Sequence, residues 1–448
     1  MDLKLALAAI LYYVTSHVLF SLSYAIMLIE LKAKVTRRKR RIVEGLTHSF
    51  QNLIDGVVSL VTEKYWLLDL LPQAQKPVHT VLLVRLDLLG DFVIWLDAAK
   101  EFRKLFPDSK ITLYANNAWL DLARDLPYWD EVVGTDVPRL RSDPAYRLIT
   151  LLKIHQRGFG VAVQATYSRE YIGDLMVRAT NASTRVGQFG DTNNIYPEKK
   201  DISDAWYSKL IASAPDSKTE YEFNSDFIRG LGSADFVGQA SRIHKHWTLP
   251  PSLSFKEPYC IMFPGASWAH KIWPAANFAL VAECLSRQYG LKILVCGTAS
   301  EHSICELVVQ TAKTPVINLA GKTPLNMMVQ LVRQSALVVA NDSASVHIAA
   351  AVCTPAVCVL GGGHFGRFLP YSTASQSEAP LPVSVYEPMP CYGCRWHCHY
   401  PLASAQAVPC IEKVSVERVL QACLQSLAVR ATVDSPLKME HREQNKKP

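Results

Sequence analysis

Both halves of the chain repeat one pattern. A strand-like run ends in a polar turn, and the turn leads directly into a helix. Residues 80–85 (TVLLVR) are apolar and β-branched, as a strand buried on both faces requires, and they lead through Gly90 and Asp91 into a helical sequence. The pattern restarts at 259–263 (YCIMF) and again at 336–340 (ALVVA). Units of this kind build parallel sheets covered by helices. We therefore expect an α/β protein with two Rossmann-like, doubly wound domains that face a cleft.

The length of 448 residues supports two domains with extensions at both ends. We expect an N-terminal hydrophobic segment with a basic patch, a helical connector, two Rossmann-like domains of which the first includes the linker, and a charged, disordered tail. In chain order these five segments cover residues 1–41, 42–77, 78–250, 251–431 and 432–448.

The N-terminal segment carries the features of a membrane anchor. Residues 5–29 contain no Asp, Glu, Lys or Arg, and seven Lys and Arg residues follow between 32 and 41. A run of this length can cross a bilayer as a helix, and the positive-inside rule places such a basic patch on the cytoplasmic side. The sequence favours a spanning helix, with an interfacial helix, a signal peptide or a buried helix as alternatives. We expect a protein of the inner (cytoplasmic) membrane with its catalytic part on the cytoplasmic side.

The charge distribution argues against a nucleic-acid partner. The formal net charge is +7, of which residues 1–76 carry +4 and residues 432–448 carry +1. The two predicted domains therefore share only +2. A protein that binds nucleic acid through phosphate contacts needs a concentrated basic surface.

The loop at 264–274 combines features of an anion site. Gly265 gives a flexible backbone, Ser267 a hydroxyl and Lys271 an ammonium, all beside the start of a predicted helix. Backbone N–H groups at a helix N-terminus favour an anion, and a lysine is a suitable point charge for a phosphate oxygen. The alternative is a solvated loop with no ligand.

Two acidic residues follow predicted strands. Asp342 stands at the start of a predicted helix, so considered alone it favours an N-cap. The alternative is a carboxylate that binds sugar hydroxyls. Asp91 is interpreted either as a first-turn acid or as a general base, with Asp87 as a weaker rival. His347, alone on an apolar helix, fits a satisfied core residue.

Four of the eleven cysteines cluster as Cys391-x2-Cys394-x3-Cys398-x11-Cys410. This spacing suits a structural zinc site, with free or redox-paired thiols and an iron–sulfur site as alternatives. The other seven occur in apolar or helical contexts and are expected to be small core residues, which fits a reducing compartment. They are Cys260, Cys284, Cys296, Cys305, Cys353, Cys358 and Cys423.

These stretches together resemble glycosyltransferase family 9, the bacterial ADP-heptose lipopolysaccharide heptosyltransferases. The matching pieces are RLDLLGD at 85–91, FPGASWAHKIWP at 263–274, KILVCGTASEH at 292–302, residues 318–352 around NDSASVH, and the spaced cysteines after 390. The resemblance covers residues 80–425. It implies a GT-B fold, an inverting reaction and no cofactor required for catalysis, with an acceptor domain followed by a nucleotide-sugar domain.

The resemblance also assigns roles to individual residues. The family's catalytic base falls on Asp91, which would deprotonate the acceptor hydroxyl. Its phosphate-contacting lysine falls on Lys271, which would stabilise the diphosphate leaving group. Ser267 matches a hydroxyl near the phosphates, Asp342 the carboxylate that holds the donor sugar, and Glu301 an acid at the ribose.

One motif departs from the family's usual Asp-Thr-Gly. Here Asp342 is followed by Ser343 and Ala344, and then by His347 of the same motif. Ser343 and His347 therefore count as candidate donor-site residues by position. The missing glycine adds a methyl group where backbone and donor would approach closely, which leaves the identity of the donor and acceptor open.

We therefore predict an inverting glycosyltransferase that moves a sugar, such as heptose from ADP-heptose, onto a membrane-associated, lipid-linked or lipopolysaccharide-type glycan. Anchoring confines enzyme and acceptor to one surface and raises their effective concentration. The alternatives are a non-catalytic nucleotide-sugar-binding scaffold at the membrane and another GT-B-fold enzyme, such as a nucleotide-sugar epimerase.

Overall fold

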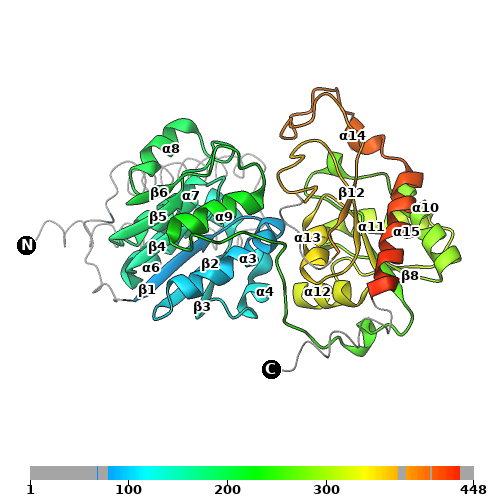
Figure 1. The fold of residues 1–448 in the computed structure, drawn as a ribbon, viewed down its shortest axis with the longest axis horizontal. Helices are drawn as coiled ribbons and strands as arrows, with labels where there is room; N and C mark the ends of the chain where they lie inside the picture. Colours follow the sequence, from blue (N-terminus) through cyan, green and yellow to red (C-terminus); the bar gives the residue numbers. More distant parts are fainter. Residues whose placement is uncertain (1–67, 69–78, 372–379, 404–405, 434–448) are drawn as a thin grey trace, which may run out of the picture. The chain divides into compact units, whose positions relative to one another are not determined.

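The computed structural model describes residues 68, 79–371, 380–403 and 406–433 (Figure 1). The predicted anchor at 1–41, nearly all of the connector at 42–77 and the tail beyond residue 433 lie outside the described residues. Within the described parts of the chain, no helix is long and apolar enough to span a bilayer.

The first half of the chain forms a six-stranded sheet in the order β3-β2-β1-β4-β5-β6. β1 pairs in parallel with both β2 and β4, and β4 pairs in parallel with β5. Residues 81–84 of β1 are at most 1% exposed, as predicted for a strand covered on both faces. The strands are β1 Thr80–Arg85, β2 Lys110–Asn116, β3 Glu131–Thr135, β4 Val161–Gln164, β5 Thr184–Gln188 and β6 Lys209–Ile211.

The second half forms another six-stranded sheet in the order β12-β11-β10-β7-β8-β9. All five neighbouring pairs in it are parallel. Its strands are β7 Tyr259–Phe263, β8 Lys292–Val295, β9 Val316–Asn318, β10 Leu337–Asn341, β11 Ala356–Val359 and β12 Val383–Val385. The two sheets confirm the predicted pair of Rossmann-like halves and fit the GT-B class.

Helices alternate with the strands, as crossover connections between parallel strands require. In the first half they are α3 Leu89–Leu105, α4 Leu120–Arg124, α5 Val137–Ser142, α6 Pro144–Arg157, α7 Tyr171–Ala179, α8 Pro197–Asp204 and α9 Glu220–Leu231. In the second half they are α10 Ala275–Tyr289, α11 His302–Thr311, α12 Leu325–Gln334, α13 Ala344–Ala351, α14 Pro409–Glu412 and α15 Val416–Val433.

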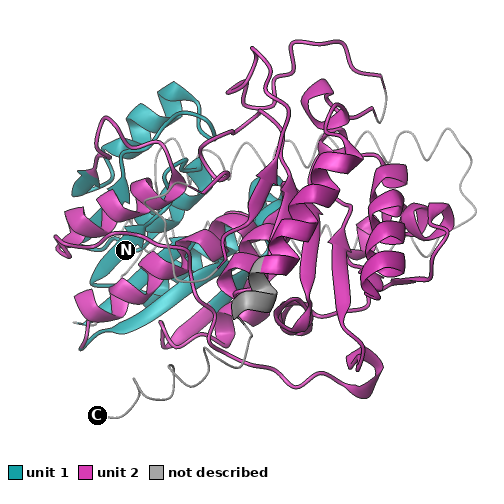
Figure 2. Cartoon of the chain, turned by 45° about the vertical axis from the view of Figure 1, so that its right-hand side comes forward, with its two compact units in different colours: residues 1–86, 108–117, 133–210 teal, residues 87–107, 118–132, 211–448 magenta. Residues whose placement is uncertain are grey.

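The chain divides into two compact units, each made of separate segments (Figure 2). Unit 1 comprises residues 1–86, 108–117 and 133–210, and unit 2 comprises 87–107, 118–132 and 211–448. Unit 2 therefore contains α3 as well as the second sheet. In unit 2, α3 contacts both α9 and α13.

The expectation that seven cysteines lie in the core is right for five of them, which are buried. Cys284 is only half-buried, and Cys353 is exposed. Cys353 follows the end of α13 with a φ of +61°, so the chain turns out of the helix there and carries the side chain to the surface. All eleven thiols are free.

Candidate functional site

The carboxyl ends of two adjacent parallel strands in unit 2 place the predicted site residues. β7 leads into the loop that carries Lys271, and β10, which pairs with β7, ends immediately before Asp342. Ligands of open α/β sheets bind at this edge. The sequence pattern predicts both positions because each lies where a buried strand ends.

Lys271 and Asp342 form an ion pair with 3.2 Å between Nζ and Oδ2. Their side chains are only 13% and 15% exposed, so little water screens the pair. The N-cap interpretation of Asp342 is wrong, since Ser343 occupies that position of α13 and the Asp342 carboxylate faces the lysine. Ser343 instead shares a hydrogen bond of 2.8 Å with the Ser345 hydroxyl.

Asn341, the last residue of β10, fixes the lysine loop. Its side chain is completely buried, its Oδ1 accepts from the Trp273 backbone N–H at 3.1 Å, and its Nδ2 donates to the Pro264 carbonyl at 2.7 Å. Trp273 is itself fully buried and donates from Nε1 to the Val414 carbonyl. Both ends of the lysine loop are therefore tied to the core. Sequence reasoning missed Asn341 because its partners are about seventy residues away.

Glu301 lies beside the start of the same loop. Its Oε2 accepts from the Thr298 backbone N–H at 2.7 Å and from the Thr298 hydroxyl at 2.9 Å, which completes a capping box. A Cβ at Gly265 would collide with the Glu301 carboxylate. A side chain at position 265 would therefore displace the Glu301 carboxylate, and Glu301, the residue predicted to bind the ribose, lies at the loop. Ser267 is exposed on it.

Asp91 lies in the first turn of α3, three residues after Leu88, which occupies the N-cap position. The start of α3 lies against α13, where a Cβ on Gly90 would be 3.3 Å from His347 Cδ2. The next helical residue, Phe92, stacks on Trp119 with ring centroids 3.8 Å apart and fixes the helix. The turn that carries Asp91 and the helix that follows Asp342 thus meet within unit 2.

His347 is a buried residue with a defined partner, as its apolar helix suggests. Its Nδ1 and the Tyr371 hydroxyl are 2.7 Å apart, and the two rings stack. Burial lowers the pKa of His347 to about 4, opposed by Asp342 and reinforced by Lys271. The imidazole is therefore neutral at physiological pH. No sequence signal identified Tyr371 as its partner.

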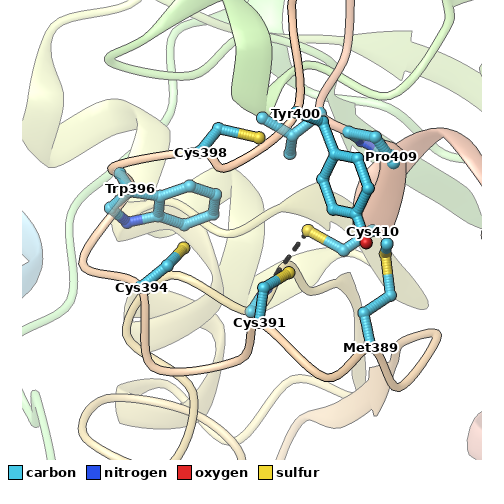
Figure 3. Close-up of a pocket in the computed structure, with 10 residues that line it drawn as sticks. Met389, Cys391, Cys394, Trp396, Cys398, Tyr400, Pro409 and Cys410 are labelled. Carbon is cyan, nitrogen blue, oxygen red and sulfur yellow. Dashed lines mark hydrogen bonds between the residues drawn. The ribbon is translucent and has the colours of Figure 1, made fainter.

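The four clustered cysteines line one pocket together with Met389, Trp396 and Tyr400 (Figure 3). The Gly362 backbone N–H donates to the Cys410 sulfur at 3.4 Å. Across the described residues, no three His, Cys, Asp or Glu side chains are arranged to hold a metal ion, so these thiols do not form a preassembled ligand set. The loop that carries three of these cysteines, residues 389–400, also contacts Lys271, because Lys271 Nζ lies 4.5 Å from the centroid of the Trp396 ring.

The comparisons with known proteins agree with this fold and these motifs. The model of glycosyltransferase family 9 (heptosyltransferase) matches residues 200–379. Lipopolysaccharide heptosyltransferase 3 of Escherichia coli is 23% identical over 283 residues, which are 61% of this chain and 79% of that protein. Lipooligosaccharide heptosyltransferase 2 of Haemophilus influenzae is 34% identical over 128 residues, 28% of this chain and 37% of that protein.

Solved structures show the same fold. A glycosyl transferase family 9 structure from Veillonella parvula has a TM-score of 0.59 at 16% identity, covering 80% of this chain and 99% of that chain. The ADP-heptose lps heptosyltransferase II of E. coli has a TM-score of 0.55 at 16% identity, covering 78% and 99%. The protein is a glycosyltransferase with two Rossmann-like halves. Over residues 200–379 it is similar to glycosyltransferase family 9 (heptosyltransferase), the family that its motifs resemble.

The ion pair makes a prediction about stability. Lys271→Met and Asp342→Asn should each lower the free energy of unfolding by about 3 kcal/mol, because each leaves a poorly solvated charge without its partner. The double variant should lose less than the sum of the two, by about 1–3 kcal/mol. Denaturant unfolding of the four proteins measures this coupling, and strictly additive losses would contradict it.

His347 makes a prediction about pH. Its depressed pKa means that the unfolded chain takes up a proton near pH 6.5 while the folded protein does so only near pH 4. This contribution to stability is complete above pH 6.5 and is lost as the pH falls to 4, by an amount on the order of 3 kcal/mol. The difference in unfolding free energy between wild type and His347→Gln should shrink over that window. A difference independent of pH would show that His347 titrates normally.

Proposed function

We propose that the protein is an inverting glycosyltransferase that transfers heptose from ADP-heptose to a lipopolysaccharide-type, lipid-linked acceptor at the cytoplasmic face of the inner membrane. The observation that carries the proposal is the Lys271–Asp342 pair at the ends of two central parallel strands. The names of the relatives, which are lipopolysaccharide and lipooligosaccharide heptosyltransferases, support the sugar and the acceptor.

In this reaction the Asp91 carboxylate takes the proton of the acceptor hydroxyl. The acceptor oxygen then attacks the anomeric carbon from the side opposite the nucleotide, forming the new glycosidic bond while the bond to the diphosphate breaks. Negative charge grows on the departing phosphate, where the Lys271 ammonium stabilises it. Lys271 has to donate hydrogen bonds to both the Asp342 carboxylate and a phosphate, and one ammonium has enough N–H donors for both.

The remaining candidates bind the donor. Asp342 accepts hydrogen bonds from sugar hydroxyls while it holds Lys271 in place. Ser267 and the N-terminal backbone of α13, with Ser343, face the phosphates, since helix N-termini attract anions. Glu301 binds the ribose beside the lysine loop. Neutral His347 packs between α13 and the turn that carries Asp91.

Replacing the base should remove turnover but leave binding intact. Asp91→Asn should lower kcat about 10²–10⁴-fold, since it keeps shape and hydrogen bonding but cannot take a proton. Donor affinity, measured by calorimetry with the sugar nucleotide that gives the largest thermal shift among ADP-, UDP- and GDP-sugars, should stay near the wild-type value. Turnover by Asp91→Asn at the wild-type rate would remove Asp91 from the role of base.

Asp87→Asn is the matched control, because it removes another carboxylate from the same strand-to-helix turn. It should keep most of the activity. The same assay separates the alternatives to a transferase. Donor turnover without any acceptor would favour an epimerase-type enzyme. Donor binding without turnover on any lipid-linked acceptor would favour a non-catalytic scaffold.

We also propose that Cys391, Cys394, Cys398 and Cys410 bind a structural zinc ion, because all four line one pocket and thiolates are the preferred ligands of such sites. Since the thiols are not preassembled, the ion would have to draw them together when it binds. Protein purified under reducing conditions should contain about one zinc per chain, and chelation should lower its melting temperature. Cys394→Ser should abolish both effects. Metal-free protein would favour free or redox-paired thiols, and visible absorbance with bound iron would favour an iron–sulfur site.

A further inference from the structure

The cysteine loop, residues 389–400, lies against the lysine loop of the proposed donor site. Its Trp396 ring faces the Lys271 ammonium, whose Nζ is 4.5 Å from the ring centroid. Trp396 also meets Trp268 edge-on, with ring centroids 6.0 Å apart. In Figure 3, Trp396 lies between Cys394 and Cys398 on the wall of the cysteine pocket.

A glycine run makes room for this ring. Cβ atoms on Gly361 or Gly363, which follow β11, would collide with the Trp396 indole. The Arg395 backbone N–H donates to the Gly363 carbonyl at 2.8 Å, and the Gly393 N–H donates to the Gly362 carbonyl at 2.8 Å. The glycines therefore allow the cysteine loop to pack closely on the segment after β11 and to form backbone hydrogen bonds with it.

The backbone of the loop adopts an energetically unfavourable conformation at Trp396 and at the residue before it. Arg395 and Trp396 have φ values of +52° and +66°, a region that side chains other than glycine seldom adopt. Such a conformation persists only where the surrounding contacts over-determine it. These hydrogen bonds of the loop, together with the packing of the indole on Gly361 and Gly363, hold the ring beside the lysine.

The segment just before Cys410 makes a second connection to the lysine loop. The Val408 backbone N–H donates to the His270 carbonyl at 2.9 Å, and His270 Nδ1 lies 2.5 Å from the Gln406 carbonyl. His270 is the residue before Lys271. Ring contacts and backbone hydrogen bonds from the cysteine region thus converge on the same short stretch of the lysine loop.

We infer that Trp396 is a positioning residue that holds the Lys271 ammonium over its ring and against Asp342, ready for the donor diphosphate. The face of an indole attracts a cation without carrying a formal charge. The ammonium therefore keeps a single anionic partner and remains available to a phosphate, which a second carboxylate in the place of Trp396 would prevent. The inference rests on the proposed function for the identity of the ligand, but the contact between ring and lysine does not.

Ligand binding tests the inference in the full chain. Trp396→Leu should weaken ADP binding about 10-fold in calorimetry, and Trp396→Phe should recover most of the loss. Adenosine, which lacks phosphates, should bind equally to all variants. Tyr392→Leu is the matched control, because Tyr392 packs on Gly362 from the same loop. The ADP affinity of this control should match that of the wild type. If it lost as much ADP affinity as Trp396→Leu, the role of Trp396 would be packing alone.

A double-mutant cycle and a graded substitution separate electrostatics from packing. In a Lys271→Met background, Trp396→Leu should cause no further loss of ADP affinity, and an independent loss would overturn the inference. Fluorinated tryptophans placed only at position 396 weaken the negative ring face with little change of shape. ADP affinity should fall stepwise with fluorination, and a constant affinity would also overturn the inference.

Lysine reactivity tests the contact without any nucleotide. At one fixed pH, the acetylation rate of Lys271, followed by peptide mass spectrometry, should rise several-fold in Trp396→Leu relative to the exposed Lys313, and it should stay constant in Tyr392→Leu. If Lys271 responds but the wild type binds no ADP, the proposed function fails and the positioning role stands. If the wild type binds ADP while Trp396→Leu alters neither affinity nor reactivity, the positioning role fails.

Discussion

The ion pair between Lys271 and Asp342 is the constraint on which the rest of the site depends. Two charges that are nearly shielded from water are stable only if they stay together, so the loop after β7 and the turn after β10 have to keep one fixed separation. Asn341 secures it, because its buried amide holds both sides of the lysine loop from the end of β10. A mobile loop could not keep a lysine at this distance from a strand end.

The same pair explains why the neighbouring elements are built as they are. The Trp396 ring faces the ammonium of a lysine that one carboxylate already holds, and it attracts that cation without adding a second negative charge. The glycine run after β11 is then needed to let that ring approach. On the other side, His347 is neutral, so it adds no second cation beside Lys271. The buried surroundings favour one positive charge at this position.

The sequence predicted the strands because their signal is local. Short apolar, β-branched runs bounded by polar turns are typical of buried strands, and β1, β7 and β10 begin and end within one residue of the expected bounds. Asp342 shows where this reasoning stops. A carboxylate before a helix looks like a cap when only neighbours in sequence are considered, and its true partner lies 71 residues earlier in the chain. Tyr371 and Trp396 have no periodic pattern at all, so only the folded chain identifies them as partners of His347 and Lys271.

The alanine at position 344 can be understood from the close contact between α3 and α13. A Cβ at Gly90 would make ordinary van der Waals contact with Ala344, at 3.5 Å from its Cα and 3.8 Å from its methyl group, and would be tight only against His347 Cδ2, at 3.3 Å. The tight contact at the start of α3, where Asp91 lies in the first turn, is therefore with the His347 ring. The methyl group of Ala344, where the resembled motif has glycine, is therefore compatible with the packing of α3 on α13, which holds Asp91 near the helix that follows Asp342.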